Sequence, residues 1–144
     1  MKTPRQGGRA FRVAGLFFLV SCPLMALTAD VPAWLAPGLA VLAVCAHSLG
    51  EVWESSAGYA LGFGLAPDHA QGQYQGFFGI GFDAGQAVAP LVLTGAVLGL
   101  GHAGWLLLGV FFAALGAAAP PLAAWAERTR PAAARSGTAL LDAE

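Results

Sequence analysis

Charged residues are scarce in this chain: Asp, Glu, Lys and Arg make up 10% of its 144 residues, whereas 57% are hydrophobic. A soluble domain carries roughly 25% charged residues, so this chain lacks the polar surface that would cover a globule in water. The composition therefore predicts an all-α integral membrane protein in contact with a lipid bilayer. The formal net charge of −1 gives no indication of a nucleic-acid partner, and we expect none.

Lys and Arg are missing altogether between Arg12 and Arg128. The seven basic residues form two clusters, one within residues 1–12 and the other within residues 128–135. By the positive-inside rule both clusters belong on the cytoplasmic side, so the chain must cross the membrane an even number of times. We expect both termini to be cytoplasmic.

Catalytic and metal-binding patterns are missing as well. The two cysteines, Cys22 and Cys45, lie in different apolar segments without CxxC or zinc-type spacing, and we interpret both as small packing residues. No Ser/His/Asp, HExxH or Cys/His arrangement occurs, which argues against an enzyme. His47 and Glu51, four residues apart, are too few ligands to predict a metal site. We expect no metal and no cofactor.

Four apolar segments are long enough to cross a bilayer, which takes about 20 residues of helix. Turn-rich stretches at 28–33, 66–73 and 99–104 separate them. Four crossings agree with the even number that the basic clusters require, and we expect a multi-pass membrane protein. The expected order is a basic cytoplasmic segment (1–12), a four-helix transmembrane region (13–126, with helices at about 13–29, 34–65, 74–100 and 105–125) and a disordered cytoplasmic tail (127–144).

The first apolar segment has an alternative interpretation as a signal peptide. A basic start precedes the apolar run, and "LVSC" (19–22) fits a lipoprotein cleavage box. Cleavage there would leave three crossings and place the C-terminal arginines outside. It would also leave "PLMALTA" where a polar tether is expected, so we favour a retained helix.

Ionisable residues interrupt the second apolar segment. His47, Glu51, Glu54 and Gly58 are spaced i, i+4, i+7 and i+11, which places them on one helix face. Roughly 20 Å of helix lies on either side of Glu51, so this carboxyl is expected near the middle of the membrane. A charged group at that depth is costly without a partner or a task.

The third apolar segment repeats the arrangement with Asp83, Gln86, Pro90 and Thr94, spaced i, i+3, i+7 and i+11. Asp83 is expected near mid-depth, and Pro90 is expected to kink the helix. Acids on two neighbouring spans predict a shared hydrated cavity. Desolvated carboxyls hold protons more strongly and can exchange them as water access changes sides, as in a proton-coupled carrier.

Structural roles remain open for these polar groups. Glu51 and Glu54 could be satisfied by nearby serine hydroxyls and tryptophan N–H groups, and His47 fits a hydrogen-bonded packing role better than a direct one. Glycines spaced by four also occur on these helices, Gly58 with Gly62 and Gly81 with Gly85. Such pairs let helix backbones approach closely in lipid, and we interpret them as packing positions.

The stretch "GEVWESSAGYALGFGLAPDHAQGQYQGFFGIGFDAGQAVAPLVLTGAVLGLGHAGWLLLG" (50–109) resembles the last part of a bacterial major facilitator superfamily transporter. The likeness is one of pattern and order: a helix ending in "LAP", a short polar loop, a Gly-rich helix with "APL" midway, and a final helix ending in "WAERTR". It covers roughly residues 12–130, which would match the last four of twelve helices in that family.

The resemblance implies a secondary carrier of the bacterial plasma (inner) membrane that works by alternating access. Its second and third helices would line the cavity, and the first and last would be more peripheral. Glu51, Asp83 and Gln86 would then line the cavity. Two departures stand out. Gln71 and Gln73 occupy a loop that often carries an arginine, and eight helices are absent, although the cavity of this fold lies between two six-helix halves.

The sequence therefore leads to a ranked set of functions. The first is a fragment of a secondary transporter, exporting a small molecule or drug in exchange for protons and requiring missing helices. The second is a four-helix carrier that works as a homo-oligomer with Glu51 as its proton-binding carboxyl. The third is a non-transport membrane subunit whose acids pair with a partner.

Overall fold

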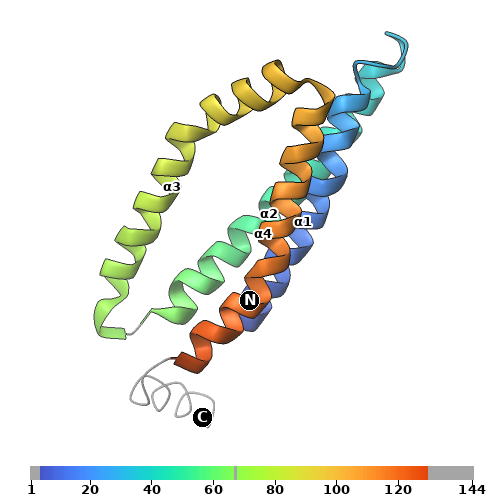
Figure 1. Cartoon of the computed structure of the whole chain (residues 1–144). Helices are drawn as coiled ribbons and strands as arrows, with labels where there is room; N and C mark the ends of the chain where they lie inside the picture. Colours follow the sequence, from blue (N-terminus) through green and yellow to red (C-terminus); the bar gives the residue numbers. More distant parts are fainter. Residues whose placement is uncertain (1–3, 67, 130–144) are drawn as a thin grey trace.

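A computed structural model describes residues 4–66 and 68–129 (Figure 1). This part of the chain is made of helices joined by short turns: α1 (Pro4–Leu27), α2 (Ala36–Leu65), η1 (Asp68–Ala70), α3 (Gln71–Leu93), η2 (Thr94–Leu98) and α4 (His102–Thr129). η1 is a 3₁₀ turn and η2 is a π-helical turn that continues α3. The all-α class is confirmed, and four helices of the described part are long and apolar enough to cross a membrane.

Prolines mark several helix ends. Pro4 begins α1, and Pro37 lies in the first turn of α2, where a missing N–H leaves no intrahelical bond unmade. At the other end of α2, Ala66 precedes a proline and adopts an extended backbone (φ −72°, ψ 135°). A residue before proline is disfavoured in helical conformation, which explains why α2 ends at Leu65.

α1 and α4 are longer than the apolar segments alone predict. α1 already begins at Pro4 rather than near residue 13, so the basic residues Arg5, Arg9 and Arg12 belong to the helix. Charge keeps these side chains out of an apolar layer but does not oppose helix formation, for which arginine has a high propensity. α4 likewise extends to Thr129, and the remainder of the expected tail lies outside the described residues.

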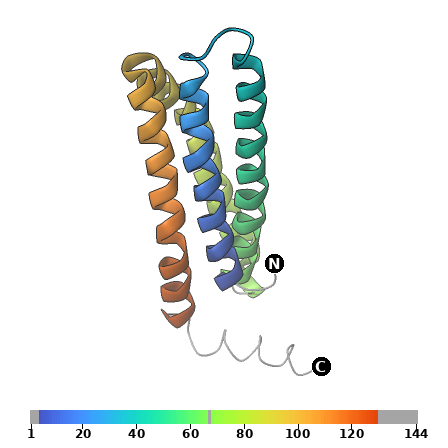
Figure 2. The same cartoon turned by 90° about the vertical axis from the view of Figure 1, so that its right-hand side faces the viewer.

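α1 lies between α2 and α4 and runs antiparallel to both (Figures 1 and 2). An ion pair joins the ends of α1 and α4, with Arg5 Nε 2.9 Å from Glu127 Oε2. At the opposite end of the bundle, Asp30 Oδ2 lies 3.0 Å from His102 Nε2. The first and last helices of the described chain therefore begin and finish at the same end, as an even number of crossings requires.

Small residues spaced by seven form the contact between α1 and α4. Three pairs run along the two helices in opposite directions, and an added Cβ at the glycine of each pair would lie within 3.4 Å of its partner: Gly8 with Ala123, Gly15 with Gly116, and Cys22 with Gly109. The two residue numbers of each pair add to the same sum. This constant register is expected when two antiparallel helices carry small residues with the same repeat. The absence of large side chains lets the two backbones pack closely.

A second set of small residues, one position earlier on α1, faces α2. All members are buried and again spaced by seven: Gly7, Ala14 and Ser21 on α1, with Ala43, Gly50 and Ala57 on α2. A Cβ on Gly7 would meet the Ala57 carbonyl at 3.3 Å. Adjacent pairs of small residues thus allow α1 to pack against two neighbours at once, which makes it the central helix of the bundle.

α3 stands apart from the other three helices (Figure 1). None of the 18 residues in its most apolar window is buried, whereas 39% of the equivalent window of α1 is. Its contact with α2 lies near the turn that joins them, where Gly58 lies beside the Phe78 ring and Gly62 beside the Gln75 amide. Beyond that point α3 diverges from the bundle.

The return from α3 to α4 is tightly built. The chain changes direction between the last turns of α3 and the start of α4 (Figure 1), and it turns at Gly101, whose φ of +54° suits glycine. A Cβ on Gly104 would collide with the Ala96 carbonyl oxygen. The expectation that Pro90 kinks the helix stays a prediction, since the π-helical turn begins only four residues further on.

Candidate functional site

α2 presents two packed sides, and its ionisable residues lie between and beside them. Residues facing α1 are spaced by seven at Ala43, Gly50 and Ala57, whereas Gly58 and Gly62 face α3. At 3.6 residues per turn, His47 and Glu54 lie about 20–40° from the Gly58 direction, and Glu51 lies between the Gly58 and Gly62 directions. The polar stripe of α2 therefore points toward α3 along the part of α2 from which α3 has diverged.

His47 is the best-connected residue of this stripe. Its Nδ1 lies 3.3 Å from the Ser21 hydroxyl of α1, and its ring centroid lies 4.9 Å from that of Phe18. On the other side, His47 Nε2 is 3.8 Å from Glu51 Oε1. Ser21 is fully buried and Glu51 is largely exposed, so the three side chains lead from the α1–α2 contact to the open side of α2.

Glu51 and Glu54 occupy different surroundings on the same helix. The Glu51 side chain is 63% exposed, whereas Glu54, one turn further on, is only partly exposed. In the described part of the chain neither carboxylate forms an ion pair with Lys or Arg. Of the serines expected to satisfy them, Ser56 instead donates its hydroxyl to the Val52 carbonyl at 2.8 Å.

The polar residues of α3 divide between two directions. Gln75 and Phe78 mark the side of α3 that contacts α2. Gln86 lies about 20° around the helix from Gln75, and Asp83 lies about 80° from it and further still from Phe78. Gln86 therefore belongs to the side that faces α2, and Asp83 lies at its edge. Both residues are exposed.

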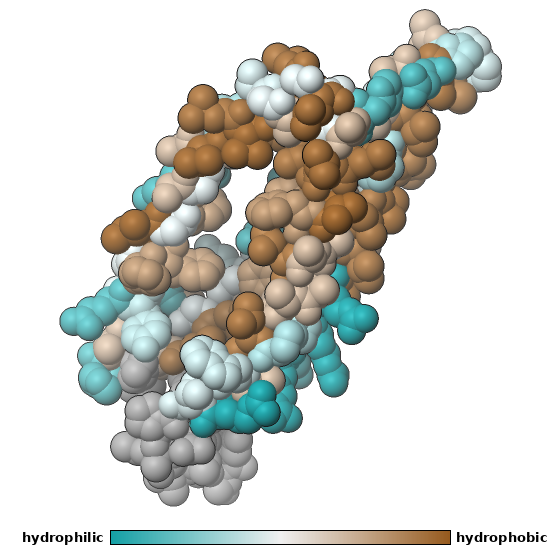
Figure 3. All heavy atoms as spheres, viewed as in Figure 1, coloured by the Kyte–Doolittle hydropathy of each residue, from teal (hydrophilic) through white to brown (hydrophobic). Residues whose placement is uncertain are grey.

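An opening passes between α3 and the bundle of α1, α2 and α4 (Figure 3). The stripe of α2 and the Gln86 side of α3 border it. Within residues 4–66 and 68–129, no hydrogen bond or ion pair joins the acids of α2 to α3 across this opening. Glu51 and Gln86 thus border one opening, which the described residues leave uncovered, whereas Asp83 lies at its edge; their roles stay predictions.

Of the two predicted pairs of packing glycines, one contacts a neighbouring helix and the other does not. Gly58 is buried, and both Gly58 and Gly62 contact side chains of α3. Gly81 and Gly85 have no atom within 4 Å of an added Cβ. Their role in packing stays a prediction, and it requires a partner other than the described part of this chain.

Metal chemistry finds no support in the described residues. No group of three or more His, Cys, Asp or Glu side chains is close enough there to hold an ion. His102 pairs with Asp30 at the end of the bundle, His69 lies in η1, and His47 pairs with a single carboxylate.

Sequence analysis missed the residues that hold His47 in place and the contacts of α1. The signal was present: pairs of adjacent small residues recur every seven positions along α1, as Gly7–Gly8, Ala14–Gly15 and Ser21–Cys22. The predicted packing positions were spaced by four, whereas these pairs recur every seven residues. The repeat of seven identifies α1 as a helix with two neighbours.

Comparison of the chain with protein-family models, with curated proteins and with solved structures found no match. The fold is that of an all-helical chain with four helices able to span a membrane, in which an opening lies between α3 and the other three helices (Figure 3).

Proposed function

We propose that this chain is part of a secondary active transporter of the bacterial inner membrane, of the major facilitator type, which exports a small molecule in exchange for protons. Glu51 binds and releases the proton, and Gln86 and Asp83 lie at the substrate passage. The four helices cross the membrane with both termini in the cytoplasm, where the two clusters of Lys and Arg belong.

One observation carries the proposal: Glu51 of α2 and Gln86 of α3 border one opening, and no Lys or Arg of the described chain forms an ion pair with Glu51. A carboxylate at mid-membrane that lacks a cation must be protonated, hydrated or both. Reversible protonation at such a depth is what couples a proton gradient to transport. His47, hydrogen-bonded to Ser21, supplies a second group that can hold a proton beside Glu51.

The exposure of α3 supports the idea that the passage is completed by other helices. α3 carries Asp83 and Gln86 and yet buries no residue of its apolar window. Lipid is a poor environment for such side chains, so helices from elsewhere in the transporter cover this side. In a transporter with two helical halves the passage lies between them.

Transport is tested in everted membrane vesicles containing the full protein, with ethidium as a probe substrate and an imposed pH gradient. The expected result is ethidium movement that follows the gradient and falls at least about tenfold in Glu51→Gln, which cannot release a proton. Glu127→Gln is the matched control. It also removes one carboxylate, but this one lies at the end of α4, where it pairs with Arg5 and is away from the proposed passage. Equal transport by Glu51→Gln and the parent would contradict the assignment of Glu51.

The uncovered α3 favours one alternative, a homo-oligomeric four-helix carrier in which a second copy covers α3. Purified chain reconstituted alone into liposomes would then transport ethidium without further helices, whereas a transporter fragment would be silent. A third possibility, an assembly subunit without transport activity, predicts a stable partner that is lost from Asp83→Asn.

A further inference from the structure

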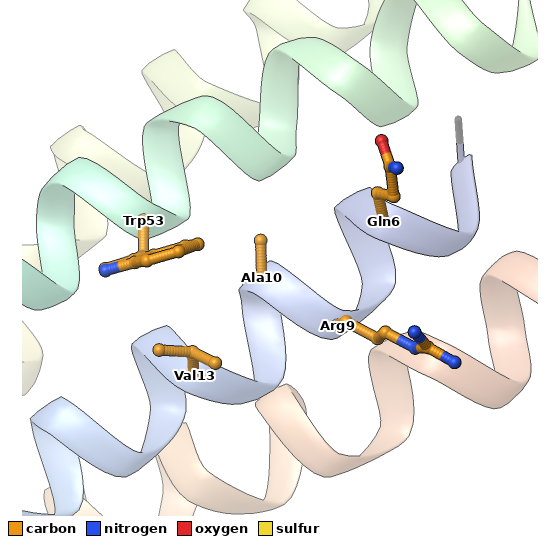
Figure 4. A pocket seen from close by; sticks show the side chains of 5 residues that line it. All are labelled: Gln6, Arg9, Ala10, Val13 and Trp53. Atoms are coloured by element: carbon orange, nitrogen blue, oxygen red, sulfur yellow. The ribbon is translucent and has the colours of Figure 1, made fainter. Parts of the chain in front are cut away.

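A shallow groove of about 420 Å³ lies between α1 and α2 near the end of the bundle that carries Arg5 and Glu127. Gln6, Arg9, Ala10, Val13 and Trp53 line it (Figure 4). The first four are spaced i, i+3, i+4 and i+7 and therefore share one face of α1. The groove is separate from the polar opening beside α3.

Polarity changes along the groove within two helical turns. Gln6 and Arg9 occupy the part nearest the end of α1, and Ala10 and Val13 follow deeper in the bundle, with the Trp53 ring beside them (Figure 4). The Arg9 side chain extends away from Val13. A long basic side chain directed toward the helix end, with a tryptophan below it, is typical of the boundary between headgroups and acyl chains.

Arg9 carries a positive charge that the described chain does not neutralise. The Arg5 side chain, one turn earlier, is paired with Glu127, whereas no ion pair or side-chain hydrogen bond of Arg9 occurs within residues 4–66 and 68–129. Glu51 and Glu54, which flank Trp53 on α2, form no ion pair with Arg9 in the described residues. The polar end of the groove therefore suits an anion.

We propose that this groove binds one anionic phospholipid, with its phosphate on Arg9 and an acyl chain along Ala10, Val13 and Trp53. A soluble anion would gain nothing from the apolar part, and a zwitterionic lipid would bring a second cation close to Arg9. The site would tie the cytoplasmic ends of α1 and α2 to the lipid composition of the inner leaflet. The inference rests on the membrane placement in the proposed function.

The test uses the full chain in liposomes with Trp53 as its sole tryptophan, after Trp34, Trp105 and Trp125 are replaced by phenylalanine. Phosphatidylglycerol and phosphatidylcholine, each brominated on its acyl chains, are compared as quenchers of Trp53 fluorescence. We expect phosphatidylglycerol to bind about fivefold more strongly, the factor expected for one basic contact. Arg9→Gln should abolish this preference.

Arg12→Gln is the matched control, because it removes the same charge one turn further along α1 from a residue that does not line the groove. A preference that persists in Arg12→Gln and disappears in Arg9→Gln supports the site. Equal quenching by both lipids, or equal losses in the two variants, would overturn it and leave the transport proposal intact. Absence of quenching by either lipid would overturn both, since Trp53 would then lie outside the membrane.

Discussion

α1 and α3 are both long apolar helices, but they relate to their surroundings in opposite ways. α1 buries 39% of its most apolar window against α2 and α4, and α3 buries none of its own. The difference lies in the arrangement of small residues. α1 carries them in adjacent pairs every seven positions, matched by equal repeats on two neighbours, whereas Gly81 and Gly85 of α3 meet nothing in the described part of the chain.

α1 finds its packing partners within the chain, whereas most of α3 finds none among the described residues. α2 and α4 both pack against α1, and ion pairs lie at the two ends of the bundle, between Arg5 and Glu127 and between Asp30 and His102. α3 carries polar groups at mid-length without covering them. A long apolar helix that contacts its own chain mainly near one end is expected to find further neighbours elsewhere.

The largest difference in stability is expected when one glycine at the contact of α1 with α4 and one glycine of α3 are each replaced by a large residue. Gly116→Leu should destabilise the protein by about 1–3 kcal/mol, because its Cβ would lie 2.7 Å from the Phe11 carbonyl oxygen of α1. Gly85→Leu, with nothing within 4 Å, shares the same gain in helix propensity and should cause no loss. Unfolding in SDS, followed by circular dichroism, measures both. Equal losses would show that the two helices are packed alike.

Thiol labelling tests whether water reaches the side of α3 that carries Gln86. In a background without cysteine, Gln86→Cys should react with a hydrophilic methanethiosulfonate about tenfold faster than Ala87→Cys, a difference of about 1.4 kcal/mol in effective access. The two positions lie at nearly the same depth and about 100° apart around the helix. Faster labelling at Ala87→Cys would place the wet side away from α2 and remove the proposed passage.

The contact between Ser21 and His47 should contribute less than the glycine contacts. Ser21→Ala removes the hydroxyl 3.3 Å from His47 Nδ1, and we expect a loss of about 0.6–1.7 kcal/mol in SDS unfolding. Ser56→Ala is the control, because the Ser56 hydroxyl bonds only within its own helix, to the Val52 carbonyl. A larger loss in Ser56→Ala would indicate that the α1–α2 contact does not depend on His47.

The smallest expected effect belongs to the ion pair that joins the ends of α1 and α4. The Arg5 side chain is 74% exposed, so its coupling to Glu127 should be about 0.2–1 kcal/mol and should fall with added salt. A double-mutant cycle of Arg5→Gln and Glu127→Gln measures it. A coupling above that range, insensitive to salt, would mean that this end of the bundle is held by charge rather than by small residues.

The number and approximate limits of the helices could be read from the sequence, because apolar length and breaks at Pro and Gly act locally. The polar stripe of α2 followed in the same way from residue spacing. The longer reach of α1 did not, since the basic residues that end the apolar run do not end the helix. The proposed transport activity and the roles of Glu51, Asp83 and Gln86 stay predictions.

By itself, the sequence determined that four apolar helices form and which residues share a face, since both depend on neighbours along the chain. Only the tertiary structure decided that α1 is central, that His47 contacts Ser21 and that α3 is uncovered. The physical reason is register. Glycine pairs occur on both α1 and α3, and close approach requires a second helix whose small residues match them over several turns.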